Sequence, residues 1–84
     1  FANIHVTRKK MEKVVKAIAE HLDVDASKVV PEASLIDDLG ADDFDIVELT
    51  IAIQEATGTS ISSEEEANVK TVGDFIKIVE SKSV

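Results

Sequence analysis

The chain has 84 residues, 44% of them hydrophobic, and it carries a formal net charge of −8. This length suits one domain with a single modest core, and the apolar fraction is too high for a disordered chain. The absence of cysteine excludes disulfides, zinc–thiolate sites and a cysteine nucleophile. We therefore expect residues 1–84 to form one domain.

Acidic and basic residues are separated along the sequence. The first part holds Arg8, Lys9, Lys10, Lys13, Lys16 and Lys28. No Lys or Arg lies between Val29 and Val69, a span with these acids: Glu32, Asp37, Asp38, Asp42, Asp43, Asp45, Glu48, Glu55, Glu64, Glu65 and Glu66. Such a body repels nucleic acid phosphates and complements a basic protein surface.

No apolar run approaches the roughly 20 residues of a membrane-spanning helix, and no signal-peptide pattern is present. We expect a soluble protein without direct membrane insertion, either a monomer or a subunit of a complex. Because the chain begins with Phe1 rather than Met, it reads as a fragment or a processed form. The expected compartment is the cytoplasm or, if a targeting segment was removed, an organelle matrix such as that of a mitochondrion or plastid.

The first predicted helix follows a short lead of residues 1–6, with Thr7 as its N-cap, and ends near Leu22. Its apolar stripe is Met11, Val14, Val15, Ile18 and Leu22, at helical spacing. Basic residues in its first turn oppose the helix dipole, at a cost of a few tenths to about 1 kcal/mol each.

A long loop is expected from about residue 23 to 41, because Pro31 forbids helix just before it. Gly40 supplies a position where positive φ is tolerated. The apolar residues that could pin the loop to the bundle are Val29, Val30, Leu35, Ile36 and Leu39.

The remaining helices have recognisable starts and stops. The second is predicted from Asp42, a good N-cap, to Thr57, with Gly58 as its stop. A short third helix begins at Ser62 and Ser63, and a last one begins near Thr71. The expected capping pairs are Ser63 with Glu66 and Thr71 with Asp74, and the last apolar stripe is Val72, Phe75, Ile76 and Val79. The prediction is an all-α four-helix bundle with three longer helices, one short third helix and a long first loop.

The second helix has two apolar faces. At about 100° per residue, Ile46, Leu49, Ile53 and Ala56 form one stripe, which we expect to face the core. The opposite face carries Phe44, Glu48, Ile51 and Glu55, flanked by Val47 and Gln54. This second face reads as a docking surface for a basic, partly apolar partner. The alternatives are that these are ordinary exposed apolar side chains, or that Phe44 or Val47 tucks under the loop.

Other chemistry is poorly supported by the sequence. The acids Asp37, Asp38, Asp42, Asp43 and Asp45 could attract cations diffusely, but no EF-hand frame fits them. His5 and His21 lack the spacing of metal ligands, so no metal site is predicted. We also expect no enzyme, because exposed carboxylates at a helix start lack a pocket that shifts their pKa values.

The segment DLGADDFDIVEL, residues 38–49, resembles the acyl carrier protein signature D-L-G-x-D-S-L-D-x-V-E-L. PEASLIDDLG, IAIQEATGTSI and EEEANVKTVGDFI resemble the end of that family's first loop, the end of its second helix and the start of its last two helices. The resemblance implies a four-helix bundle that carries acyl groups on 4′-phosphopantetheine, which is esterified to a serine at the start of the second helix.

The resemblance also implies a recognition role for the second helix. Its partners would be basic surfaces, either of fatty acid synthesis enzymes or of small basic helical subunits in organellar complexes. The partner-binding residues so implied are Asp42, Phe44, Asp45, Val47, Glu48, Ile51, Gln54 and Glu55, where Gln54 replaces an acid common in the family.

The departure from the family lies at Asp43, which occupies the serine position. A carboxylate has no hydroxyl to form the phosphodiester, so no cofactor is expected. The sequence favours a carrier-like domain that acts as a binding or structural subunit without an acyl group. The alternative is a genuine acyl carrier of fatty acid biosynthesis whose serine is replaced by Asp43, through divergence or by design.

Overall fold

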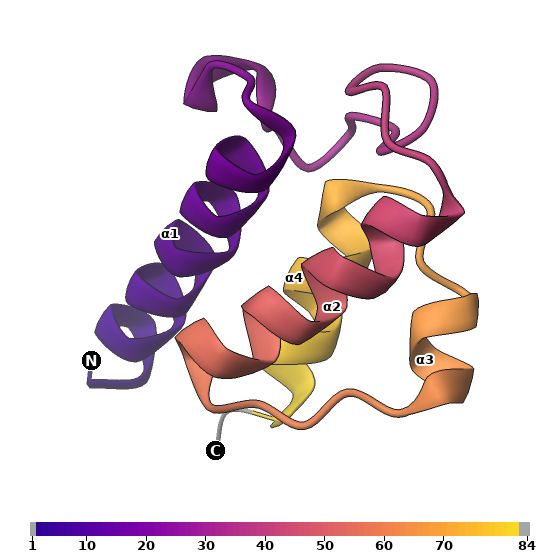
Figure 1. Ribbon diagram of the computed structural model, residues 1–84. Coiled ribbons are helices and arrows are strands. Elements are labelled where there is room, and N and C mark those ends of the chain that lie inside the picture. Colours follow the sequence, from indigo (N-terminus) through magenta and orange to yellow (C-terminus); the bar gives the residue numbers. More distant parts are fainter. Residues whose placement is uncertain (1, 83–84) are drawn as a thin grey trace.

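The computed structural model describes the backbone of residues 2–82 and the side chains of residues 9–82. It contains the helices α1 (Ala2–Leu22), α2 (Asp43–Thr57), α3 (Ser63–Ala67) and α4 (Val72–Lys82), with a 3-10 turn η1 (Ala26–Lys28). No strand is formed within residues 2–82. The predicted all-α four-helix architecture is confirmed (Figure 1).

The core lies between α1, α2 and α4, and α1 packs against both of the other two helices. In Figure 1, α2 runs between α1 and α3, and α4 lies behind it. Ile18, Leu49, Ile53 and Phe75 are completely buried in this core. Full burial of side chains of this size contributes roughly 1.5–3 kcal/mol each, so these residues are a large part of the driving force for folding.

Helix α1 is longer than predicted. It begins at Ala2, so the predicted lead and the Thr7 N-cap are wrong. Residues 2–22 contain neither Gly nor Pro to interrupt a helix. The early start also removes most of the predicted dipole cost, because residues 8–10 now lie beyond the first turn, where the dipole effect has faded.

The predicted end of α1 at Leu22 is confirmed. The next residue, Asp23, has φ of 55°, a left-handed conformation that Asp tolerates better than most residues. The amide of Val24 then donates to the carbonyl of Ala19 at 3.1 Å, which satisfies one of the carbonyls left free at the helix end.

The long first loop is tied to the start of α4 by backbone hydrogen bonds. The Leu35 amide donates to the Lys70 carbonyl at 3.0 Å, and the Val72 amide donates to the Ala33 carbonyl at 3.1 Å. Gly73 donates to the Pro31 carbonyl at 3.0 Å. A Cβ at Gly73 would meet that oxygen at 3.0 Å, so the close approach favours glycine.

This pairing decides which apolar loop residues face inward. Val29, Leu35 and Leu39 are buried, as predicted, but Val30 and Ile36 are exposed and that part of the prediction is wrong. Each exposed residue directly follows a buried one. Leu35 and Ile36 lie in a turn closed by the Ala41 amide, which donates to the Leu35 carbonyl at 2.8 Å, and in this turn Leu35 faces the core while Ile36 faces solvent.

The N-terminal caps of α3 and α4 match their predictions to within one residue. The capping box of α3 joins Ser62 to Glu65, not Ser63 to Glu66. Two adjacent serines precede three consecutive glutamates, so the sequence spacing fits both registers. Lys82 donates to the Glu65 carboxylate at 2.6 Å, and this hydrogen bond is the main reason that the pKa of Glu65 is lowered.

The start of α4 is confirmed as a reciprocal cap. The Asp74 carboxylate accepts the amides of Lys70 at 2.8 Å and Thr71 at 3.0 Å, and the Thr71 hydroxyl accepts the Asp74 amide at 3.3 Å. Burial raises the pKa of Asp74, but these hydrogen bonds outweigh burial and the net pKa is lowered.

We predict that Asp74→Ala lowers the free energy of unfolding at pH 7 by about 0.5–2 kcal/mol, since it leaves two amides without their acceptor. A carboxyl whose folded pKa is lowered stabilises the fold above its unfolded pKa, near 3.8, and loses that effect as the pH falls through the folded pKa. Urea unfolding should therefore show a smaller difference in stability between the unmodified chain and Asp74→Ala at pH 3 than at pH 7. A loss of the same size at both values would contradict this, and Glu80→Ala, exposed on the same helix, is the control.

Candidate functional site

The start of α2 is held by a reciprocal cap. The Asp42 carboxylate accepts the Asp45 amide at 2.8 Å, and the Asp45 carboxylate accepts the Asp42 amide at 3.1 Å. Gly40, with φ of 75°, turns the chain toward this cap, and Gly58, with φ of 68°, ends the helix. The predicted N-cap at Asp42, the predicted helix end at Gly58 and the positive φ expected at Gly40 are all confirmed.

Asp43 is the first residue of α2, and it is exposed. Among the described residues its carboxylate has no hydrogen-bond or ion-pair partner. It borders a groove of about 360 Å³ between α2 and α3, whose apolar lining includes Ile36, Ile46, Val47 and Val69. Glu66 and Lys70 also line this groove, so the Asp43 carboxylate borders a groove with both apolar and charged lining.

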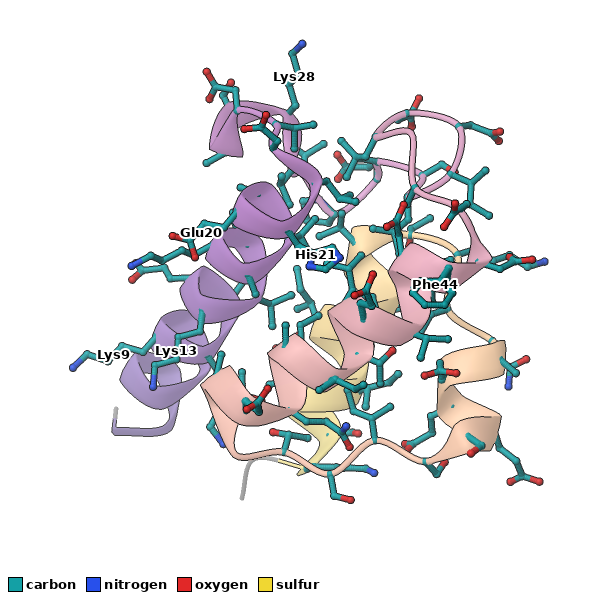
Figure 2. All side chains as sticks on the ribbon, viewed as in Figure 1. Lys9, Lys13, Glu20, His21, Lys28 and Phe44 are labelled. Carbon is teal, nitrogen blue, oxygen red and sulfur yellow. The ribbon has the colours of Figure 1, made fainter. Side chains whose placement is uncertain are left out.

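The face of α2 that points away from the core carries Phe44, Val47, Glu48, Ile51 and Glu55, which we call the outer face. The exposed fractions of its apolar members are 72% for Phe44, 44% for Val47 and 51% for Ile51. The alternative that Phe44 or Val47 tucks under the loop is therefore wrong. Figure 2 shows the Phe44 ring at the surface of the first turn of α2. Both glutamates are exposed beside these residues.

The inner face of α2 differs from its prediction at two positions. Ile46, Leu49 and Ile53 are buried as expected, whereas Ala56 is exposed in the last turn, where it borders a surface groove with α1. Thr50 was missed: it is buried, with 3% of its surface exposed, and its hydroxyl donates to the Ile46 carbonyl at 2.8 Å. That bond to the preceding turn allows a hydroxyl to lie in the core.

Gln54 serves the fold. Its side-chain oxygen accepts the amide of Ile61 at 2.7 Å, and the residue is half-buried. This bond holds the α2–α3 connection against α2. Gln54 thus lies at the edge of the outer face with one of its polar atoms already engaged.

The fold brings one histidine to the acidic helix. The Nε2 atom of His21, in the last turn of α1, lies 3.6 Å from the Glu48 carboxylate and 3.9 Å from that of Asp45. Figure 2 shows the imidazole between α1 and α2. Sequence reasoning missed this cluster because His21 and Asp45 belong to different helices and share no spacing pattern. The other histidine, His5, lies outside the described side chains.

The acids around the loop are largely engaged with the backbone. The Asp38 carboxylate accepts the Ser34 amide at 2.7 Å, and Asp42 and Asp45 cap α2. Three of the five acids weighed as calcium ligands therefore have structural roles in the turn and the helix start. They do not converge on one point as the ligands of an EF-hand do.

The sequence of residues 12–79 matches the family described as Phosphopantetheine attachment site. The chain belongs to this family. The match includes all of α2 and α3 and most of the core, so the carrier-type bundle and the family agree. Domains of this family normally carry 4′-phosphopantetheine and are generally not catalytic themselves.

Two further observations bear on this phosphopantetheine-attachment domain. Within residues 2–82, no helix is both long and apolar enough to cross a membrane. At the start of α2, residues 40–45 are Gly, Ala, Asp, Asp, Phe and Asp, so this turn offers carboxylates and no hydroxyl. The chain therefore belongs to the family by its fold and sequence match, and its α2 begins among the carboxylates of Asp42, Asp43 and Asp45.

We predict that Asp42 and Asp43 contribute differently to stability. Asp42→Ala removes a cap and should lower the free energy of unfolding by about 1 kcal/mol. Asp43→Ser removes only a favourable charge near the helix dipole, so the loss should stay between about 0.3 and 1 kcal/mol and should shrink in high salt. Urea unfolding at low and high salt measures both, and an Asp43→Ser variant less stable than Asp42→Ala would contradict the assignment.

Proposed function

We propose that this chain is a carrier-type domain that works without a prosthetic group and binds a basic, partly apolar protein partner through the outer face of α2. The observation that carries the proposal is Asp43. A free, exposed carboxylate stands at the start of α2, the position that corresponds to the attachment serine in the acyl carrier signature.

The residues present do not fit 4′-phosphopantetheine. The family's linkage is a phosphodiester to a hydroxyl, and Asp43 has none. Other hydroxyls do not replace it. The Ser34 hydroxyl accepts the Asp37 amide at 3.1 Å in the loop, and Ser60 lies beyond the opposite end of α2. The scaffold tolerates the substitution because a negative charge suits the first turn of a helix.

The outer face has the properties of a docking surface. Phe44, Val47 and Ile51 expose apolar area on one side of a single helix, and Glu48 and Glu55 flank them. Because no Lys or Arg lies between Val29 and Val69, no cation on this segment neutralises the face. An apolar centre with a charged rim is typical of protein interfaces, and its sign selects a basic partner.

The partner chemistry that fits is a basic amphipathic helix or a basic enzyme surface. Small basic helical subunits and enzymes of fatty acid synthesis are the two classes that the family resemblance implies. A small basic helical subunit suits a domain without an acyl group, because its binding needs only the outer face of α2. We expect the protein to act as a binding subunit rather than as an enzyme.

A second candidate is a genuine acyl carrier in which Asp43 replaces the attachment serine. The groove beside Asp43, between α2 and α3, favours it. The two candidates differ in one measurable property, which is whether the natural residue at position 43 accepts the prosthetic group.

We predict that incubation with a phosphopantetheinyl transferase and coenzyme A leaves the mass of this chain unchanged. Asp43→Ser restores a hydroxyl at an exposed helix start, so this variant should gain the mass of one phosphopantetheinyl group. Intact-protein mass spectrometry measures both. A mass gain on the chain with Asp43 would overturn the proposal in favour of the acyl carrier, and Ser60→Ala in the Asp43→Ser background checks the site of attachment.

We predict that a synthetic basic amphipathic helix, with Arg and Leu on one face, binds this chain more weakly as salt rises. Glu48→Lys should weaken binding about three- to tenfold and flatten the salt dependence, whereas Phe44→Ala should weaken it with the salt dependence retained. Fluorescence anisotropy in the presence of a chelator measures these effects.

Glu80→Lys is the matched control, since it makes the same charge change at an exposed position of α4, outside the outer face. Equal weakening by Glu48→Lys and Glu80→Lys would mean that net charge alone drives binding. An affinity that does not change with salt, with Glu48→Lys or with Phe44→Ala would contradict the proposal that the outer face binds the partner.

A further inference from the structure

The interhelical cluster of His21, Asp45 and Glu48 combines three metal-ligating groups from two helices. One ligand atom from each lies within 4.8 Å of the other two. Asp45 and Glu48 are three residues apart on α2 and therefore lie on the same side of that helix. The imidazole of His21 approaches them from α1. The cluster is thus a product of the fold and not of local sequence.

The spacing of these atoms suits a divalent ion. Ligand atoms about 2.0–2.2 Å from a tetrahedral zinc ion lie about 3.3–3.6 Å from one another. The Nε2 atom of His21 lies 3.6 Å from the Glu48 oxygen and 3.9 Å from the Asp45 oxygen. The ligand atoms of Asp45 and Glu48 lie within 4.8 Å of each other, so side-chain movements of up to about 1 Å would bring all three within bonding range of one ion.

The ligands also differ in how firmly they are held. One oxygen of Asp45 accepts the Asp42 amide, which fixes the carboxylate and leaves the other oxygen directed at His21. Glu48 is held less firmly by its neighbours, because 47% of its side chain is exposed. The site is open to solvent on one side, which leaves coordination positions for water.

We propose that His21, Asp45 and Glu48 form a binding site for a divalent transition metal ion such as Zn²⁺, linking α1 to α2. One imidazole with two carboxylates is a donor set suited to borderline metals, whereas Ca²⁺ and Mg²⁺ prefer oxygen ligands alone. The proposal does not depend on the docking function, because its test needs no partner.

The test is calorimetric titration of the full chain with ZnCl₂, combined with NMR of the histidine rings. One saturable equivalent is expected, with the His21 ring signals shifting on binding. His21→Gln should weaken this Zn²⁺ binding at least about tenfold and should leave any weak Ca²⁺ binding unchanged. Glu48→Gln should weaken Zn²⁺ binding in the same way.

Two matched controls separate this site from general attraction to an acidic surface. Glu55→Gln removes an exposed carboxylate about two turns beyond Glu48 along α2, and His5→Gln removes the only other histidine of the sequence. Both should leave Zn²⁺ affinity unchanged. The proposal is overturned if His21→Gln binds Zn²⁺ as tightly as the unmodified chain, if the His21 signals do not move, or if no saturable binding occurs at millimolar Zn²⁺.

Discussion

The packing of α1 against both α2 and α4 is the constraint on which the other features depend. Leu49 and Ile53 are completely buried there, together with Ile18 and Phe75. Because a helix turns about 100° per residue, burial of this stripe forces Phe44, Val47 and Ile51 to the solvent side. The same packing brings the last turn of α1 beside Asp45 and Glu48. The outer face and the interhelical cluster are both consequences of one buried contact.

The crowding of acids at the start of α2 has separable causes. Asp42 and Asp45 cap the helix and bind each other's amides. Asp43 makes no such bond, and its charge merely suits the helix dipole. In the proposed function, Asp43 matters through its position, because we place it where the acyl carrier signature has its serine. The proposal requires that the hydroxyl can be absent while the outer face is kept, and the two features do rest on different residues.

The negative charge of this molecule works against folding, whereas it would favour the proposed binding of a basic partner. A net charge of −8 on 84 residues favours solubility but repels itself in the compact state. Local caps, such as those of Asp74 and Glu65, offset part of this repulsion by giving carboxylates amide or ammonium partners. On the outer face, Glu48 lies 3.6 Å from His21 and Glu55 is exposed, and the proposed cationic partner would reduce the charge repulsion there. The same electrostatic attraction would then both bind the partner and reduce the charge repulsion within the fold.

The sequence by itself determined the helix class, the bounds of α2, the buried stripe of α4 and the exposed apolar face. These follow from local rules: helical periodicity, capping residues and the conformational freedom of Gly40 and Gly58. It misplaced the start of α1, because Thr7 precedes the apolar stripe and has the side chain of an N-cap, whereas the helix begins at Ala2. Only the tertiary structure decided that Ile36 faces outward, that Thr50 is buried and that His21 meets Asp45 and Glu48. Those outcomes depend on contacts between distant segments, which no local pattern encodes.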